Sequence, residues 1–444
     1  MIKYLALLFC GLTAQANTNA DFPAGFKWCV ATSAHQIEGG NTNSDWWDWE
    51  QAPGHIRNGD RSGQAPDHWN RLAQDTRLLQ ELHVSEYRFS VEWAKIEPTP
   101  GHWDWNAVSH YKDELALLRA AGIEPMVTLH HFTLPRWFAA KGGWEAADAP
   151  EQFARYAVFV MTNIGPEVHD WITINEPMVH LVAGYMSGSF PPGRKGDFKT
   201  VLPPMIGLLR SHAAAYHAMK AAAANGHVPI RIGVAHHLRI FDPPHGFHPF
   251  DAFLAGKFDH AFNWAFANAL ETGRLRFWIP LAVRVNRKLP EVKGTQDFIG
   301  VNYYGRDIVR MKFSGIGFSL SVEKAAGVTD LGWEIYPHGF YRILKATARH
   351  FPGKKIFVTE NGIADAKDVK RAKFLADHLV ELARAMHEGV PVEGYCHWSL
   401  LDNFEWGEGF APRFGLYSVD YSTLERKARA SALRFSEIAA NNGF

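Results

Sequence analysis

The sequence predicts a (β/α)₈ barrel of the TIM type, a single domain with its active site at the C-terminal mouth of the strands. Eight short apolar segments alternate with longer segments of helical periodicity along a chain of 444 residues. The chain contains no internal repeat, low-complexity segment or linker rich in Ser, Gly and Pro, which favours one domain. An open doubly wound sheet is the alternative, but no glycine-rich phosphate loop follows the first expected strand.

The eight expected strands are short and apolar, and turn residues bound several of them. Segments between them have helical spacing, as in residues 68–83 and in residues 110–122, where Tyr111, Leu115 and Leu118 lie at i, i+4 and i+7. The expected strands are residues 26–32, 85–91, 123–130, 170–175, 231–236, 297–302, 355–360 and 392–398.

The composition is that of a globular protein without a strongly charged surface. Hydrophobic residues make up 47% of the chain and charged residues 21%, and 46 basic residues balance 46 acidic ones. This balance argues against a nucleic-acid-binding or anionic-membrane surface. The 16 tryptophans suit both a packed core and the stacking of sugar rings on aromatic faces.

The N-terminal residues 1–16 resemble a signal peptide. Lys3 precedes a short apolar run, and Ala14-Gln15-Ala16 fits the small-x-small cleavage pattern. We expect cleavage near Ala16, export to the periplasm or the medium, and a mature domain of residues 17–444. A buried N-terminal strand is a less favoured alternative, and a lipoprotein anchored at Cys10 is disfavoured by the bulky Phe9. No later stretch is apolar and long enough to span a bilayer.

Several expected strands end in polar or aromatic residues, which is unusual for segments that enter a core. Residues 170–175 end at Asn175 and are followed by Glu176. Residues 297–302 end at Asn302, and residues 355–360 end at Glu360. A buried carboxylate costs several kcal/mol or more unless it is paired or hydrogen-bonded. Because the C-terminal ends of barrel strands meet at one mouth, these side chains are expected on the rim of a pocket.

Glu176 and Glu360 would face each other across this mouth, an arrangement that suits glycoside cleavage. One carboxyl must be protonated to expel the leaving group, while the other must be ionised to attack the anomeric carbon or activate water. The sequence supplies the pair and not its spacing, so retaining and inverting chemistry both stay open at this level. The alternative is structural, with one or both glutamates pairing with an arginine or capping a helix.

The segments WITINEPM and IFVTENG, which contain these glutamates, resemble the two signature motifs of glycoside hydrolase family 1, the β-glucosidase family. The resemblance extends over nearly the whole mature chain, with further segments in the family's order. These segments are residues 22–40, 67–93, 297–305, 329–337 and 394–421.

The resemblance implies a retaining β-glycosidase that needs no cofactor and no metal and acts on a small glycoside or oligosaccharide. Glu176 would be the general acid/base with a raised pKa, and Glu360 the nucleophile, which must stay ionised. Arg88 and the hydroxyl of Tyr304 would hydrogen-bond Glu360 and favour its charged form. Asn175 would hold the sugar 2-hydroxyl, and Asn302 would be a further polar positioning residue close by.

The resemblance also implies a pocket for the terminal sugar. Gln36, His131, Glu405 and Trp406 match positions that hydrogen-bond its outer hydroxyls, and Trp398 matches its aromatic floor. Relatives that act on 6-phosphorylated sugars replace the Glu-Trp pair with a small residue and add a nearby lysine. The carboxylate present here would repel a phosphate, so we expect an unphosphorylated sugar, with glucose favoured and galactose and fucose left open.

Some residues depart from the family pattern. Cys29 stands where glycine is usual, residues 130–133 replace a commoner Tyr-His-Trp-Asp run, and His236-His237 follow where an Asn is usual. These departures bear on the aglycone more than on the reaction. Cys29 and Cys396 lie on the first and eighth strands, which are neighbours in a closed barrel. Two buried free thiols are favoured over a disulfide, and both alternatives stay open.

Three rival functions are weaker. A metal-dependent hydrolase would suit the 23 histidines, but adjacent histidines on a strand point to opposite faces, and no helical H-E-x-x-H is present. A non-catalytic sugar-binding protein would lack one of the two glutamates. A transglycosylase would pass the covalent intermediate to a sugar or alcohol instead of water, and this alternative stays open, as does the oligomeric state.

Overall fold

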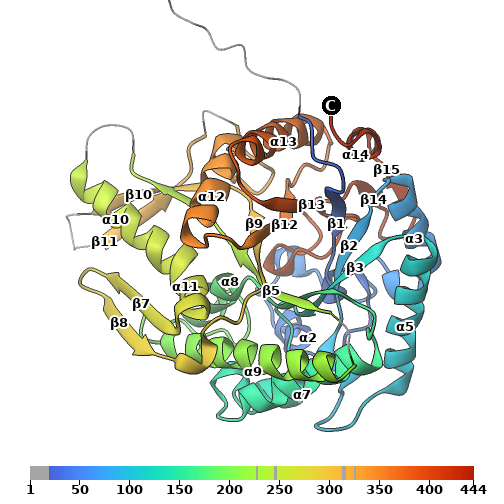
Figure 1. Cartoon of the computed structure of the whole chain (residues 1–444), viewed down its shortest axis with the longest axis horizontal. Helices are drawn as coiled ribbons and strands as arrows, with labels where there is room; N and C mark the ends of the chain where they lie inside the picture. The colour runs from blue at the N-terminus through green and yellow to red at the C-terminus, as the bar shows by residue number, and fades with distance from the viewer. Residues whose placement is uncertain (1–19, 227–228, 245–247, 313–316, 325–326) are drawn as a thin grey trace, which may run out of the picture.

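The computed structural model describes residues 20–226, 229–244, 248–312, 317–324 and 327–444. Its centre is a closed barrel of parallel strands in the order β1-β13-β12-β9-β5-β4-β3-β2 (Figure 1). All of them coincide with the strands expected from the sequence to within two residues at each end, so the predicted fold is confirmed. The barrel strands are β1 (Lys27–Ala31), β2 (Glu86–Ser90), β3 (Glu124–His130), β4 (Asp170–Asn175), β5 (Arg231–His237), β9 (Phe298–Tyr303), β12 (Lys355–Gly362) and β13 (Val392–Trp398).

Helices follow each barrel strand, and the long ones cover the outside of the barrel (Figure 1). Tyr111, Leu115 and Leu118 lie in one of them and are each at most 6% exposed, as their spacing predicted. The helix expected at residues 68–83 is interrupted at Arg71, whose φ of −127° is not helical. The principal helices are α3 (Leu72–Glu81), α5 (Trp105–Ala120), α7 (Ala149–Asn163), α9 (Leu202–Gly226), α10 (Pro249–Asp259), α11 (Ala265–Thr272), α12 (Pro337–His350), α13 (Arg371–His387) and α14 (Ala430–Asn441).

Shorter helical elements occupy the connections. They are α1 (Ala34–Ile37), α2 (Asp45–Gln51), η1 (Arg57–Gly59), η2 (His68–Asn70), α4 (Trp93–Ile96), α6 (Arg136–Ala140), η3 (Gly143–Glu145), α8 (Pro177–Val182), η4 (Ala183–Ser187), η5 (His260–Trp264), η6 (Pro290–Val292) and η7 (Trp406–Glu408).

In the described part of the chain, three small sheets lie outside the barrel, and the sequence did not predict them. In β7, successive residues alternate between exposed and buried, a strand pattern that lies within a region of helical segments. Together these sheets extend the connections after β5, β9 and β13. Their strands are β6 (Ile240–Asp242) with β10 (Arg306–Lys312) and β11 (Gly317–Ser321), β7 (Arg274–Ile279) with β8 (Val283–Lys288), and β14 (Tyr417–Val419) with β15 (Arg426–Ala428).

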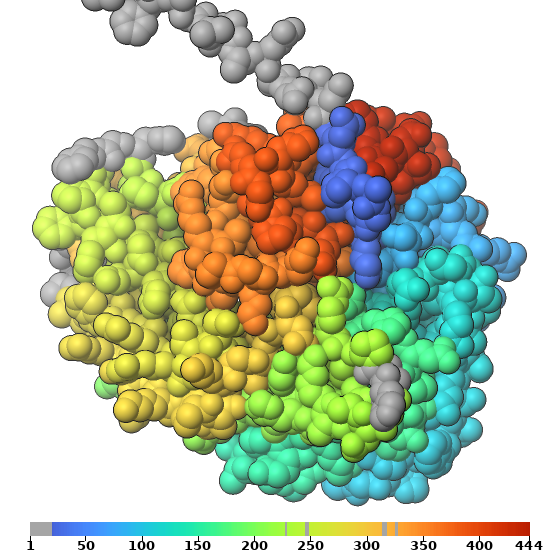
Figure 2. Space-filling model, in the orientation of Figure 1, coloured from blue at the N-terminus to red at the C-terminus, as the bar shows by residue number. Residues whose placement is uncertain are grey.

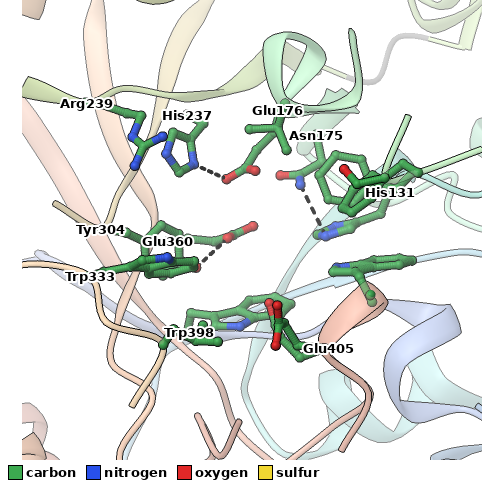
Figure 3. Close-up of a pocket in the computed structure, with 18 of the residues that line it drawn as sticks. His131, Asn175, Glu176, His237, Arg239, Tyr304, Trp333, Glu360, Trp398 and Glu405 are labelled. Atoms are coloured by element: carbon green, nitrogen blue, oxygen red, sulfur yellow. Dashed lines mark hydrogen bonds and ion pairs between the residues drawn. The ribbon is translucent and has the colours of Figure 1, made fainter. Parts of the chain in front are cut away.

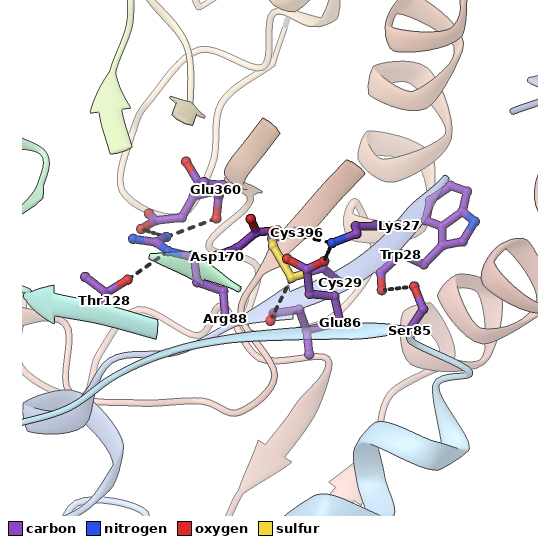
Figure 4. Close-up of a disulfide and its surroundings, with 12 residues drawn as sticks. Lys27, Trp28, Cys29, Ser85, Glu86, Arg88, Thr128, Asp170, Glu360 and Cys396 are labelled. Atoms are coloured by element: carbon purple, nitrogen blue, oxygen red, sulfur yellow. Dashed lines mark hydrogen bonds and ion pairs between the residues drawn. A yellow bond between two sulfur atoms is a disulfide. The ribbon is translucent and has the colours of Figure 1, made fainter. Parts of the chain in front are cut away.

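Side chains fill the barrel interior in layers, as alternation along the strands requires (Figure 4). The layer at the N-terminal ends of the strands is ionic: Lys27 Nζ lies 2.8 Å from Glu86 Oε2 and 3.2 Å from Asp170 Oδ2. The next layer is apolar, and beyond it lie Arg88 and Glu360, close to the mouth. Members of the apolar layer include Cys29, Met126, Ile172, Ala235, Phe298, Phe357 and Cys396.

A disulfide between Cys29 and Cys396 joins β1 to β13 inside this apolar layer (Figure 4). The sequence favoured free thiols, and the structure corrects this. The two residues are partners in the strand register, both point into the barrel, and their Cα atoms are 4.1 Å apart. The bridge closes a loop with a sequence separation of 367 residues. A disulfide of this kind stabilises a fold by about 2–5 kcal/mol.

The first described residues pack against the C-terminal helix. The backbone N–H of Ala20 donates to the carbonyl of Phe444 at 2.8 Å, and Trp28 Nε1 donates to Asn442 Oδ1 at 3.1 Å. Figure 2 shows this blue segment beside the red one at the surface. The expected signal peptide and its cleavage site near Ala16 lie outside the described residues. Across the described part of the chain, no helix has the length and apolar character needed to cross a bilayer.

Candidate active site

A cavity of about 850 Å³ opens at the C-terminal mouth of the barrel (Figure 3). Ligand pockets for small molecules commonly have volumes of about 300–1,000 Å³. Eight of the sequence-predicted site residues line it: His131, Asn175, Glu176, Tyr304, Glu360, Trp398, Glu405 and Trp406. The other three lie directly behind this wall and hydrogen-bond to it: Gln36, Arg88 and Asn302.

Glu360 reaches the cavity because β12 is irregular at its end. The register of β12 against β9 shifts between Val358 and Glu360, and such bulges re-aim side chains. The carboxylate is tolerated in a buried position because it is paired. Arg88 Nη1 donates to Oε1 at 2.5 Å, and the Tyr304 hydroxyl donates to Oε2 at 2.7 Å. Arg88 is itself fully buried, so a permanent cation is fixed at this carboxyl.

Glu176 follows β4 and precedes α8, with a left-handed φ of 45°. Two nitrogen atoms contact its Oε1: Asn302 Nδ2 at 2.8 Å and His237 Nδ1 at 3.0 Å. The backbone N–H of Glu176 donates to the carbonyl of Ala235 at 2.8 Å, which ties this turn to β5. The acid/base candidate is therefore held by backbone and side chain together.

A hydrogen-bonded chain connects the two carboxyls through Asn175. Its Oδ1 accepts from Arg88 Nη2 at 2.7 Å and from Asn302 Nδ2 at 3.1 Å. Because Oδ1 is occupied by two donors, Nδ2 is turned the other way and donates to His131 Nε2 at 3.1 Å. The orientation of this amide is thus fixed by its neighbours before any substrate binds.

Aromatic rings and a carboxyl form the opposite wall. The ring of His131 stacks on Trp398 at 5.8 Å and on Trp406 at 6.1 Å between centroids. Gln36 Nε2 lies 3.3 Å from Glu405 Oε2, and it also donates to the carbonyl of Phe404 at 2.9 Å. A flat apolar surface beside hydrogen-bonding groups suits a sugar ring, which has an apolar face and a polar rim.

Burial raises the pKa of Glu360 to about 7, with the Glu176 carboxylate acting in the same direction and Arg88 and Tyr304 acting against it. Burial likewise raises the pKa of Glu405 to about 8, reinforced by the charges of Glu360 and Glu176. The charge of Glu176 therefore disfavours ionisation of Glu360, and the charges of Glu176 and Glu360 disfavour ionisation of Glu405, while Arg88 opposes this effect at Glu360.

At Glu176 burial is the largest influence and raises the pKa. The charge of His237, the hydrogen bonds from His237 and Asn302, and the charge of Arg88 together outweigh burial and hold the pKa of Glu176 below the ordinary value. The sequence led us to expect a raised pKa at Glu176 and a fully ionised Glu360. At Glu176 the difference arises mainly from His237, which is not among the sequence-predicted site residues, and at Glu360 it arises from burial. The two carboxyls titrate as a pair, because they lie close enough for the ionisation of one to affect the other.

Backbone strain gives a separate indication that this cavity is functional. Among its lining residues that the structure describes, three that are not glycine have positive φ: Phe132 at 72°, Glu176 at 45° and Trp406 at 51°. Each such residue costs on the order of 1–3 kcal/mol and persists only where the surroundings impose it. Strain of this kind concentrates at catalytic and binding sites.

The cavity also contains residues that were not among the predicted site residues. The sequence marked His237 only as a departure from the family pattern that bears on the aglycone, and the structure places it at the end of β5, in the cavity wall. Arg239 and Trp333 come from loops, where position alone gives no signal. Further lining residues are Trp49, His55, Phe190, Lys195, Arg306, Leu331 and Phe414. Within the described residues, no group of three or more His, Cys, Asp or Glu side chains is placed to hold a metal ion.

Comparison with known proteins places this site in a family. The sequence pattern of the family described as "Glycosyl hydrolase family 1" matches residues 18–444. Beta-glucosidase A of Thermotoga maritima is 34% identical, over 95% of this chain and 98% of that protein. The 1,4-beta-D-glucan glucohydrolase of Thermotoga neapolitana is 33% identical, over 95% of this chain and 99% of that protein.

Solved structures agree with the sequence comparison. The family 1 β-glucosidase from Thermotoga maritima superposes with a TM-score of 0.90 at 33% identity, covering 96% of this chain and 99% of that one. The β-glycosidase from Pyrococcus horikoshii gives a TM-score of 0.87 at 35% identity, covering 96% of each chain. The chain therefore belongs to glycosyl hydrolase family 1 and is a glycosidase.

Proposed function

We propose that this glycosidase is a β-glucosidase that removes terminal, unphosphorylated β-D-glucosyl residues with retention of configuration. The observation that carries the proposal is a pair of buried glutamates at one cavity with different partners. Glu360 is held by Arg88 and Tyr304, and Glu176 by Asn302 and His237. Solved structures of the Thermotoga maritima relative hold castanospermine and glucoimidazole, which supports a sugar-sized ligand.

In the first step the Glu360 carboxylate attacks the anomeric carbon. A bond forms between a Glu360 oxygen and C1, the bond from C1 to the aglycone oxygen breaks, and Glu176 gives its proton to that oxygen. Arg88 and Tyr304 orient the nucleophile. Their hydrogen bonds to Glu360 weaken as the negative charge of the carboxylate is lost in the new bond to C1.

In the second step a water molecule replaces the aglycone. Glu176, now a carboxylate, takes a proton from the water while the water oxygen bonds to C1 and the ester bond to Glu360 breaks. Both glutamates return to their starting protonation, and the released sugar keeps the β configuration. Oxygen atoms, electron pairs and protons balance over the two steps.

The remaining residues serve the terminal sugar in this proposal. Asn175 holds the 2-hydroxyl, a contact that strengthens in the transition state, and Asn302 positions both Asn175 and the acid/base. The outer hydroxyls bind to a further set of residues above the Trp398 floor. This set is Gln36, His131, Glu405 and Trp406.

The panel of substrates that tests this proposal consists of nitrophenyl β-glycosides. We expect release of nitrophenol from the β-glucoside, weaker release from the galactoside, fucoside and mannoside, and the weakest from the 6-phosphoglucoside. The phosphate would lie close to Glu405, and the negative charge of Glu176 and Glu360 would repel it as well. This repulsion should cost at least about tenfold in kcat/KM. Turnover of the 6-phosphoglucoside without comparable turnover of the glucoside would contradict the assigned sugar.

We also propose that the chain is exported and cleaved near Ala16. The charged, apolar and small-x-small pattern of residues 1–16 supports this. A buried disulfide supports it too, because disulfides persist in oxidising compartments. We expect the protein recovered from outside the cytoplasm to begin near Asn17 and, once unfolded without reductant, to show no free thiol. An uncleaved N-terminus, or two titratable thiols, would contradict the proposal.

A further inference from the structure

His237 lies at the end of β5 and contacts the acid/base candidate directly (Figure 3). Its Nδ1 is 3.0 Å from Glu176 Oε1, and Asn302 Nδ2 donates to the same oxygen at 2.8 Å. Across the described chain, no hydrogen bond ends on Oε2 of Glu176. The carboxyl therefore has one oxygen occupied by protein groups and one left for a ligand.

The ring of His237 is held firmly in this orientation. It stacks on Tyr304 at 5.7 Å with an interplanar angle of 19°, and Phe262 packs perpendicular to it at 6.0 Å. Its side chain is 11% exposed. Leu238 N–H donates to the carbonyl of Asn302 at 2.9 Å, which anchors the strand end behind the ring.

We propose that His237 is a positioning residue that keeps the acid proton of Glu176 on Oε2, facing the leaving-group oxygen. The inference rests on the proposed role of Glu176. The amide of Asn302 donates to Oε1, and His237 donates to the same atom whenever its proton is on Nδ1. A proton on Oε1 would have to displace one of these donors. The acid proton is thus directed to Oε2, and the same donors stabilise the carboxylate after the proton has left.

Other charged and titratable groups surround this contact and enter any pH dependence. Arg239 lies beside the ring in Figure 3, and Tyr304 lies across its face. The remaining groups act through Glu176 or across the cavity. They are Arg88, Glu360 and Glu405.

Two substitutions separate the hydrogen bond from the ring. His237→Phe keeps an aromatic ring against Tyr304 and removes the donor. His237→Asn loses the ring but places an amide nitrogen the same number of bonds from the backbone as Nδ1, without a group that titrates near neutral pH. His387→Asn, on the exposed side of α13, is a control for the chemical change alone. Thermal unfolding of each variant confirms that it folds.

The leaving group of the substrate reports on the acid. We expect His237→Phe to lower kcat/KM for phenyl and alkyl β-glucosides about tenfold to hundredfold, the factor that a hydrogen bond to a charged group supplies. For the dinitrophenyl glucoside, whose leaving group needs no proton, the loss should be within about threefold. His237→Asn should recover most of the loss. Equal losses for all leaving groups, or an Asn variant as defective as the Phe variant, would overturn the inference.

The pH profile gives a second readout in which only the two variants are compared. Neither variant titrates at position 237, and only the Asn variant donates to Glu176. A donor to the carboxylate lowers the pKa of Glu176, so the basic limb of kcat/KM should lie at higher pH in His237→Phe than in His237→Asn. Coincident basic limbs, or the opposite order, would overturn the inference.

These outcomes are distinct from failure of the proposed function. A folded wild-type chain that hydrolyses no β-glycoside would contradict the proposed function before any variant is made. With an active wild type, the ratio of losses between leaving groups tests only the role of His237.

Discussion

The Glu360→Ala variant should fold and lose at least about 10⁴-fold in kcat for β-glucoside hydrolysis, which corresponds to roughly 5 kcal/mol of transition-state stabilisation. The reason is that alanine supplies no atom that can bond to C1. Neither Arg88 nor Tyr304 can replace it, because both are donors at this site. Steady-state nitrophenol release, after removal of any wild-type contaminant, measures the loss.

Two controls make the Glu360 result interpretable. Removing the carboxylate leaves Arg88 as a buried unpaired cation, which destabilises a fold by about 3–5 kcal/mol. Glu360→Gln retains an acceptor for Arg88 and should be nearly as inactive but more stable. Azide added to the alanine variant should attack C1 from the vacated side and form the α-glucosyl azide. A β-azide product would place the nucleophile elsewhere.

The Glu176→Ala variant should show a loss that depends on the leaving group. General acid catalysis contributes about 10²–10⁴-fold, so kcat/KM should fall by this factor for poor leaving groups and little for dinitrophenol. The second step should then be slow for every substrate, because water is no longer activated. A burst of dinitrophenol followed by slow turnover is the expected kinetic trace.

Azide should also act on the Glu176→Ala variant, with the opposite stereochemical result. It needs no general base and attacks the covalent intermediate from the face opposite Glu360, so the product should be the β-glucosyl azide. The two variants are therefore matched controls for each other. If the Glu176 variant formed the α-azide, the two roles assigned here would be exchanged.

The barrel could be predicted from the sequence because its strands are short segments with a mostly apolar middle, and segments of helical periodicity separate them. Residues 355–360, for example, read as a buried strand whatever lies around them, and β12 occupies this place. The small sheets could not be predicted in the same way. The pair β7 and β8 is half exposed and gains its structure from packing on neighbouring elements, which local spacing does not report.

The site residues could be predicted where they end barrel strands or resemble a family motif. Glu176 and Glu360 satisfied both conditions, and the structure brings them to one cavity. The partner of Glu176 could not be predicted, because His237 approaches it from the neighbouring strand across a contact that exists only in three dimensions. For the same reason, neither the lowered pKa of Glu176 nor the disulfide could be predicted. Both depend on which residues of neighbouring strands lie side by side.

The central claim is a covalent glucosyl-enzyme formed on Glu360, and a fluorosugar tests it most directly. The 2-fluoro substituent of dinitrophenyl 2-deoxy-2-fluoro-β-glucoside slows both steps, while its good leaving group allows the first to proceed. Mass spectrometry of the treated wild-type protein should find one added fluoroglucosyl group, on the peptide that contains Glu360. An adduct on another residue, or normal turnover that gives the α-anomer as first product with no adduct, would contradict the account.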